Sequence, residues 1–283
     1  MSVVEAVLLG VIQGVTEFLP ISSTAHLTLA GKMLGIVDTH APEAWTAFIA
    51  VMQLGTLLAV LLFFRKDVAG MTTCLVRDVK SRGGGRGIAG ITPESRLALL
   101  IVLGTVPVGL LGYGFKDIIE GAFTKTMLVI IASLVALAAI LWIAEKVARH
   151  SRTLPDVTWR DALLIGLAQA LALIPGSSRS GTTITGALLL GFSREAAARF
   201  SFLLSIPAVF ASGLYEMTKL HGIGDLGIVN LVVATGVSAG AGYAAIAWLL
   251  RYLMKNTTLV FVWYRIALGL LLTLLVLQDV LQP

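Results

Sequence analysis

The sequence Pro20-Ile-Ser-Ser-Thr24 interrupts the apolar region 1–35 near its middle. Each half of that region has about 15 residues, which as a helix is roughly 22 Å long. That length is short of the roughly 30 Å hydrocarbon core of a bilayer. We therefore predict a re-entrant helical hairpin whose irregular tip lies against protein or a cavity, because lipid cannot satisfy its backbone groups.

A second apolar region, 161–192, is broken in the same way by Pro175-Gly-Ser-Ser-Arg-Ser180. Between and after the two broken regions lie continuous apolar runs long enough to cross a bilayer, which takes about 20 residues. There are six such runs: 44–64, 97–115, 127–144, 200–215, 226–250 and 258–278. Because they are continuous and not alternating, they predict helices and not the strands of a membrane barrel.

The composition supports a membrane location. Hydrophobic residues make up 57% of the chain and charged residues 13%, against about 45–50% and 25% in soluble domains. A water-soluble enzyme, a disordered chain and a nucleic-acid-binding module are therefore excluded. The single cysteine, Cys74, can form neither an internal disulfide nor a cysteine metal cage.

The two broken regions resemble each other. Gly10-x-x-Gln13 recurs as Gly166-x-x-Gln169, and Pro20-x-Ser-Ser recurs as Pro175-x-Ser-Ser with a slip of one residue. Each hairpin is followed by three spans, so the second enters from the opposite face. The prediction is one all-α integral membrane domain, 1–283, with six transmembrane helices and two re-entrant helical hairpins in an inverted-topology repeat. The first repeat is 1–150, the second is 151–283, and the tips should meet near the midplane.

The basic residues indicate the orientation. On one side of the predicted topology fall those of 65–96, 145–160, 194–199 and 251–255, while the other side receives only Lys32, Lys116, Lys125 and Lys219. The positive-inside rule makes the first side cytoplasmic and places both termini outside. The charge count does not separate six spans plus two hairpins from ten spans, since both give the same sidedness.

The first tip gathers reactive side chains. Glu17 follows Gln13 by four residues, so both project from one helix face, and a carboxylate at membrane depth usually lines a site. Ser22, Ser23 and Thr24 have the pattern of a helix N-cap, but His26 within the same apolar region adds an imidazole. Hydroxyl, imidazole and carboxylate together suit nucleophilic or acid–base chemistry.

The second tip supplies a cation. Arg179 stands among hydroxyl residues at the start of a half-helix, where the helix dipole favours anions and a guanidinium suits phosphate. An anionic lipid head group is therefore the expected ligand. The alternative is a structural ion pair with Glu17 that locks the hairpins together. The residues expected around the head group are Gln13, Ser22, Thr24, Ser177, Ser178, Ser180, Thr183 and Arg265.

Three motifs carry a family resemblance. The run from Gln13 to His26 resembles the Glu/Gln-x-x-x-Glu signature, with its following serine and histidine, of the bacitracin-resistance type of undecaprenyl-diphosphatase. The run from Pro175 to Thr183 matches that family's Pro-Gly-x-Ser-Arg-Ser-x-x-Thr at every fixed position. Tyr264-Arg265 is similar to its C-terminal arginine.

This resemblance implies hydrolysis of undecaprenyl diphosphate to the monophosphate and inorganic phosphate in the bacterial plasma membrane, which recycles the carrier for peptidoglycan synthesis and confers bacitracin resistance. It implies Glu17, Ser23, His26 and Arg179 as catalytic residues, with the nucleophile left open between Ser23, His26 and water. A divalent cation, Mg²⁺ or Ca²⁺, is expected with Glu17 as its ligand, the site is expected to face outward, and a homodimer is compatible. The main alternative is a lipid flippase or transporter, because inverted repeats with broken helices are typical of transporters.

Overall fold

The computed structural model describes residues 1–37, 42–81, 91–120, 126–217 and 227–281, and nearly all of them are helical. The hairpin regions contain α1 (Val3–Phe18), α2 (Ser23–Met33), α8 (Trp159–Ala170), a 3₁₀ turn (Leu171–Leu173) and α9 (Arg179–Leu189). The other helices are α3 (Pro42–Phe63), α4 (Arg65–Ser81), α5 (Pro93–Gly114), α6 (Lys116–Glu120), α7 (Met127–Val147), α10 (Arg194–Met217), α11 (Ile228–Leu253) and α12 (Leu259–Leu277). In these residues the only strand-like pairing is an isolated bridge between Arg152 and Phe192.

Six helices are long and apolar enough to span a membrane: α3, α5, α7, α10, α11 and α12. They coincide with the six apolar runs, so the prediction of an all-α, multi-pass membrane protein is confirmed. Two of them begin at least four residues earlier than predicted. Helix α5 starts at Pro93, behind an N-cap at Thr92, and α10 starts at Arg194, because charged residues extend both helices past their apolar runs.

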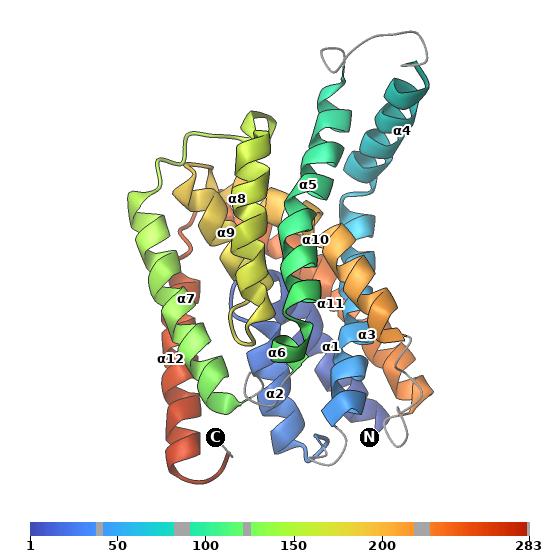
Figure 1. Ribbon diagram of the computed structural model, residues 1–283. Coiled ribbons are helices and arrows are strands. Elements are labelled where there is room, and N and C mark those ends of the chain that lie inside the picture. The colour runs from blue at the N-terminus through green and yellow to red at the C-terminus, as the bar shows by residue number, and fades with distance from the viewer. Residues whose placement is uncertain (38–41, 82–90, 121–125, 218–226, 282–283) are drawn as a thin grey trace.

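Both broken regions form helical hairpins, as predicted. In Figure 1, the turn between α1 and α2 lies near the middle of the molecule and the open ends of that hairpin point down, whereas α8 and α9 open upward. None of the four hairpin helices is long enough by itself to be a candidate span among the described residues. The arrangement fits two re-entrant hairpins that approach each other from opposite sides.

The two hairpins have matching backbones at a constant offset of 156. The N-caps Ser22 and Ser178 have φ of 73° and 69°, and each accepts a hydrogen bond from the backbone N–H three residues later. Gly35 and Gly191, which follow the returning helices, also share a positive φ. The capping boxes that begin α1 and α8 are likewise 156 residues apart.

The slip of one residue in the sequence alignment was therefore wrong. The two prolines are 155 residues apart, but the turn places Pro20 before its cap by two residues and Pro175 before its cap by three. The second tip uses Gly176, with a φ of 91°, inside its turn. The caps, and not the prolines, define equivalent positions.

The helices pair as an inverted repeat would require. Helix α1 packs along α11 and α8 along α5, while α3 packs with α10 and α7 with α12. Small residues bring the first two pairs together: a Cβ on Gly10 would lie 2.6 Å from the carbonyl oxygen of Ala234, and one on Gly166 would lie 2.2 Å from that of Gly104. Such close contacts are typical of helix packing in membranes.

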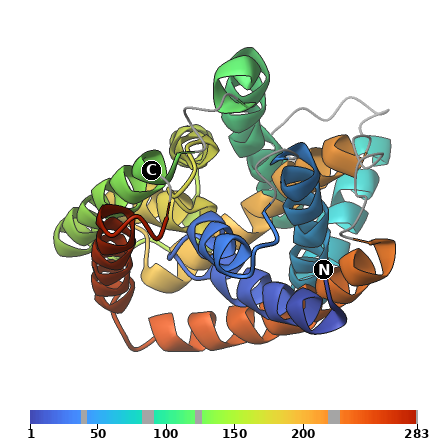
Figure 2. The same cartoon turned by 90° about the horizontal axis from the view of Figure 1, so that it is seen from below.

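The two ends of the molecule differ. The start of α1 and the end of α12 lie at one end, and α4 projects from the other beside the upper part of α5 (Figure 1). Figure 2, viewed from below, shows the first hairpin among the surrounding helices. Within the basic segment 65–96, Arg65–Ser81 forms α4, a helix that the charges did not predict. Arg82, Arg86, Lys125 and Lys219 lie outside the described residues.

Asp78 joins α4 to α5. Its carboxylate accepts hydrogen bonds from the backbone N–H and hydroxyl of Thr92 and from the hydroxyl of Ser95, at 2.8–2.9 Å. These donors lower the pKa of Asp78 to about 2, the Thr92 backbone contributing most. The Asp78 carboxylate is therefore charged at neutral pH, and its hydrogen bonds connect the projecting helix α4 to the start of α5.

Candidate active site

Glu17 lies where the two hairpin tips meet. It sits in the last turn of α1, six per cent exposed, and both of its oxygens accept hydrogen bonds. Oε2 accepts from the amide of Gln13 at 3.0 Å and from the hydroxyl of Ser23 at 2.8 Å. Oε1 accepts from the guanidinium of Arg179 at 2.5 Å. The predicted convergence of Gln13, Glu17, Ser23 and Arg179 is present in the structure.

Ser23 and Arg179 occupy equivalent positions of the two hairpins. Each is the first residue of a returning helix, α2 or α9, and they are 156 residues apart. The helix starts therefore bring a hydroxyl and a cation to the same carboxylate from opposite sides. A second bond joins the tips, because the hydroxyl of Ser180 donates to the carbonyl of Leu19 at 3.0 Å.

The second hairpin has no carboxylate at the position equivalent to Glu17. Gln169 matches Gln13 and Leu173 matches Glu17 in the 156-residue register. Without an acidic partner, both polar atoms of the buried Gln169 side chain have no hydrogen-bond partner in the described part of the chain. The two hairpins thus contribute different chemistry to one site.

Ser22 and Ser178 are helix caps. The Ser22 hydroxyl accepts from the N–H of Ala25, and the Ser178 hydroxyl accepts from that of Gly181. Ser178 also lies 3.2 Å from the hydroxyl of Ser180. Both half-helix N-termini thereby point toward the junction of the tips, where their dipoles favour an anion.

His26 lies one turn into α2. Its ring makes two hydrogen bonds, and neither of them is to Glu17. Nδ1 is 2.7 Å from the carbonyl of Ser22, and Nε2 is 2.7 Å from the hydroxyl of Tyr264. Because a carbonyl only accepts, Nδ1 carries the proton and Nε2 accepts from the phenol. The two rings also stack, with centroids 5.6 Å apart.

Tyr264 was not among the predicted site residues. The signal was present, since Tyr264 stands next to Arg265 inside an apolar span, but its pairing with His26 joins residues 238 apart. Only the packed structure brings them together. Tyr264 is 44% exposed, so the pair lies at the edge of the site.

Arg265 lies fully buried behind the second tip. Its guanidinium donates to the carbonyls of Leu134, Gly176 and Ser177 at 3.0–3.4 Å, while Nη1 has no partner among the described residues. The structure thus uses Arg265 to hold the turn that precedes Ser178. A direct contact with a head group would require Nη1 to reach past Gly181, whose missing Cβ would lie 2.8 Å from it.

The remaining predicted residues surround this centre. Thr183 is buried and its hydroxyl bonds the carbonyl of Arg179 at 2.8 Å and the hydroxyl of Ser201. Ser177 is buried, with a hydroxyl that lacks a partner within the described ranges. Thr24 is half-buried beside Ser23. All of them lie in the two tips or the first turns that follow.

A divalent cation at the junction of the tips would find two buried oxygens, the Glu17 carboxylate and Gln13 Oε1, with the carboxylate already accepting hydrogen bonds from Gln13, Ser23 and Arg179. Gln13 Oε1 is a buried acceptor with no partner in the part of the chain that the structure describes, and it lies on the residue that bonds Glu17. Three or more acidic, histidine or cysteine residues do not gather anywhere in the described ranges. Mg²⁺ is commonly bound by one or two carboxylates together with substrate phosphates and waters, so Glu17 and Gln13 are the residues that would hold it.

Known proteins resemble this chain along nearly its whole length. Residues 6–271 match the family model described as bacitracin resistance protein BacA. A protein of Syntrophobacter fumaroxidans named undecaprenyl-diphosphatase is 51% identical over 271 residues, which cover 95% of each chain. One of the same name from Myxococcus xanthus is 50% identical over 284 residues, 100% of this chain and 92% of that one. This chain is a member of the bacitracin resistance protein BacA family.

Proposed function

We propose that this protein hydrolyses undecaprenyl diphosphate to undecaprenyl phosphate and inorganic phosphate. The observation that carries the proposal is the buried carboxylate of Glu17, which bonds both a hydroxyl and a guanidinium at the junction of two hairpin tips. A hydroxyl, a carboxylate that can take its proton and a cation that can bind phosphoryl oxygens suit phosphoryl transfer. The names of the relatives agree with it.

The second tip would bind the diphosphate. Arg179 uses one nitrogen for Glu17, and its other guanidinium donors have no partner in the described residues, so they are available to phosphoryl oxygens. The N-terminus of α9 adds its dipole from the same direction. These groups stabilise the charge spread over the phosphoryl oxygens in a loose transition state. A Mg²⁺ or Ca²⁺ ion held at Glu17 and Gln13 would neutralise further charge.

Ser23 is the best placed nucleophile. Its hydroxyl already donates to Glu17, which can accept the proton as the oxygen attacks the terminal phosphorus. The anhydride bond breaks, the prenyl monophosphate leaves, and water then hydrolyses the phosphoserine. His26 is less suited, because Nδ1 is protonated and Nε2 is occupied by Tyr264.

The site would open to the outer face of the bacterial plasma membrane. Support comes from the charge distribution, since basic residues gather toward the end of the molecule that carries α4. By the positive-inside rule this end is cytoplasmic and the two termini are outside. The lipid substrate would approach from the bilayer with its head group at the tips.

Phosphate release from a long-chain prenyl diphosphate by the purified protein tests the proposal. We expect release that falls on chelation and returns with Mg²⁺ or Ca²⁺. A flippase would instead move labelled lipid between the leaflets of a vesicle without releasing phosphate, and that result would overturn the proposed hydrolase activity.

The mass of the protein in detergent tests the homodimer.

Substitution of Ser23 tests the nucleophile. Ser23→Ala should lower turnover by on the order of 10⁶-fold, the scale seen when a catalytic serine nucleophile is removed. Thr28→Ala, which removes another half-buried hydroxyl from α2, is the matched control. A phosphoenzyme trapped on the wild type and absent from Ser23→Ala supports the assignment. Near wild-type turnover of Ser23→Ala would instead leave direct attack by water.

A further inference from the structure

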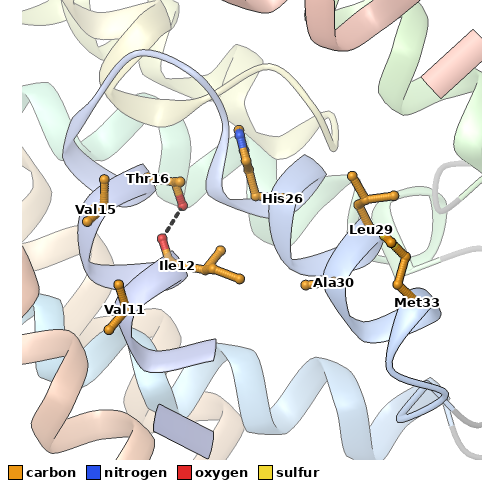
Figure 3. A pocket seen from close by; sticks show the side chains of 8 residues that line it. All are labelled: Val11, Ile12, Val15, Thr16, His26, Leu29, Ala30 and Met33. Atoms are coloured by element: carbon orange, nitrogen blue, oxygen red, sulfur yellow. Dashed lines mark hydrogen bonds between the residues drawn. The ribbon is translucent and has the colours of Figure 1, made fainter. Parts of the chain in front are cut away.

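An apolar groove runs between the two helices of the first hairpin. It encloses about 350 Å³ and is lined by α1 residues around Val11 and Val15 and by α2 residues from His26 to Met33. Figure 3 shows these side chains on facing helices, with His26 toward the turn and Met33 at the far end. The groove therefore begins beside the candidate site and leads away from it.

The polar groups in the groove wall are already bonded elsewhere. The hydroxyl of Thr16 donates to the carbonyl of Ile12 at 2.6 Å. Both ring nitrogens of His26 are bonded, to Ser22 and to Tyr264. What these residues leave facing the groove is carbon, so the chemistry suits an apolar ligand and offers nothing to a head group.

The second hairpin is packed more closely than the first at the place equivalent to the groove. In the 156-residue register, Ala30 corresponds to Gly186 and Ile12 corresponds to Ala168. A Cβ on Gly186 would lie 2.8 Å from the Cβ of Ala168, so α8 and α9 approach closely where they cross. The larger pair in the first hairpin holds α1 and α2 apart.

The groove is also open to the surrounding lipid. Helix α7 packs along α9, whereas α12, its counterpart, lies farther from α2 in the described residues. Their contacts are the pair of His26 with Tyr264 and an apolar cluster that Leu29 packs against from α2 and that includes Leu268 of α12. Met33 is 72% exposed and Val11 is 42% exposed. A lipid tail can therefore enter the groove sideways while its head group stays at the tips.

We propose that this groove binds the part of the isoprenoid tail nearest the diphosphate. The inference rests on the proposed function, because it assigns a place to that substrate's tail. His26 connects the two sites: it belongs to the helix turn that carries Ser23, and its ring forms the inner end of the groove. A diphosphate at Glu17 and Arg179 directs the attached chain along this path.

The groove can select the isoprenoid chain by its shape and not by its hydrophobicity. Lipid tails are as apolar as leucine, so moving the chain from bilayer to protein gains no hydrophobic free energy. A branched chain that fills the space between α1 and α2 gains packing contacts instead. We therefore expect kcat/KM to rise with tail length until the groove is filled and then to level off.

The test compares the ratio of kcat/KM for a long and a short prenyl diphosphate, measured by phosphate release in detergent. Val11→Trp fills the groove from α1 and should lower that ratio about tenfold, equivalent to about 1.4 kcal/mol. Leu8→Trp is the matched control, since Leu8 is 45% exposed on the same helix but does not line the groove. Ala30→Phe fills the groove from α2, and serves if Val11→Trp does not fold.

The outcomes separate the two proposals. A lower ratio in Val11→Trp or Ala30→Phe, with a wild-type ratio in Leu8→Trp, supports the groove. An unchanged ratio in a folded groove variant overturns the groove while the hydrolase stands. If the wild type releases no phosphate from any prenyl diphosphate, the proposed function fails, and the groove assignment fails with it.

Discussion

Glu17 is a nearly fully buried carboxylate, so its burial has a large desolvation cost. A carboxylate at membrane depth costs several kcal/mol unless it is paired and hydrogen-bonded. Gln13, Ser23 and Arg179 supply three donors to its two oxygens. The same contacts that make burial tolerable also place the reactive groups, so structural and catalytic roles coincide here.

Removing Arg179 should therefore affect both stability and activity. Arg179→Ala leaves Glu17 buried without its cation, and breaking such a pair typically costs about 3–5 kcal/mol. We expect a lower Tm in detergent and almost no phosphate release. The double variant Glu17→Gln/Arg179→Met removes both charges and should regain much of the Tm.

The double variant also separates the two interpretations of the ion pair. If Glu17 and Arg179 only lock the hairpins together, activity returns along with stability. If they bind and activate the substrate, the double variant is stable and inactive, which is the outcome we expect. Measuring Tm and phosphate release on the same preparation decides between them.

Tyr264 gives a second residue-scale prediction. Tyr264→Phe removes the donor to His26 Nε2 but keeps the ring stack. A lost hydrogen bond is worth about 1 kcal/mol, so we expect kcat/KM to fall about fivefold with little change in Tm. Tyr243→Phe is the control, because Tyr243 is equally exposed, at 44%, and packs against Phe63 outside the site. Equal rates for the two variants would remove Tyr264 from the site.

Sequence spacing predicts local contacts in this site and misses the long-range ones. Gln13 and Glu17 follow from helix periodicity, and the hydroxyl residues after each proline predict the caps that Ser22 and Ser178 form. The bond from Ser180 to the Leu19 carbonyl and the pair of His26 with Tyr264 depend on how helices pack. No local pattern encodes such contacts.

At the scale of elements, glycine determines how closely the hairpins approach their neighbours. Helix α8 meets α5 where Gly166 faces the backbone of Gly104. A methyl group at 166 would have to displace backbone and not a flexible side chain. This helix pair supports the second tip, so a shift here moves Arg179.

Gly166→Ala should therefore destabilise the protein, although alanine favours helices. Overpacking of this kind costs about 1–3 kcal/mol, and we expect a lower Tm with reduced turnover. Gly109→Ala on α5 is the matched control: nothing lies within 4 Å of its added Cβ, and helix propensity favours alanine by about 1 kcal/mol. A Gly166→Ala variant as stable as Gly109→Ala would show that the α5–α8 contact is not close in solution.

Element types were easier to predict than element limits. Apolar runs located all six spans, and the two broken runs located both hairpins. Helix α4 was missed because a segment rich in charged residues has no apolar run to indicate a span. The hydrogen bonds of Asp78 with Thr92 and Ser95 connect this helix to α5. The groove could not be predicted either, because it depends on how far apart α1 and α2 lie. That spacing is understood only when Ala30 and Ile12 are compared with their equivalents Gly186 and Ala168, and the structure was needed to find the equivalent positions.

For the whole molecule, the question is which end faces the cytoplasm. Six spans and two returning hairpins put the start of α1 and the end of α12 at one end and α4 at the other (Figure 1). Ten full crossings would give the same sidedness for both termini. The structure favours hairpins, because α2 and α9 have only 11 residues each, about 16 Å of helix.

Cysteine labelling of intact cells tests this orientation, and the chain suits the experiment because Cys74 is its only cysteine. In a Cys74→Ser background, Thr73→Cys marks the exposed side of α4 and Gln278→Cys marks the residue after α12. A membrane-impermeant maleimide should label Gln278→Cys in intact cells, and Thr73→Cys only after the membrane is opened or inverted. The reverse pattern would place α4 outside and turn the site toward the cytoplasm. Labelling of both positions from one side would contradict the arrangement of the six spans, because α4 and the end of α12 lie at opposite ends of the molecule.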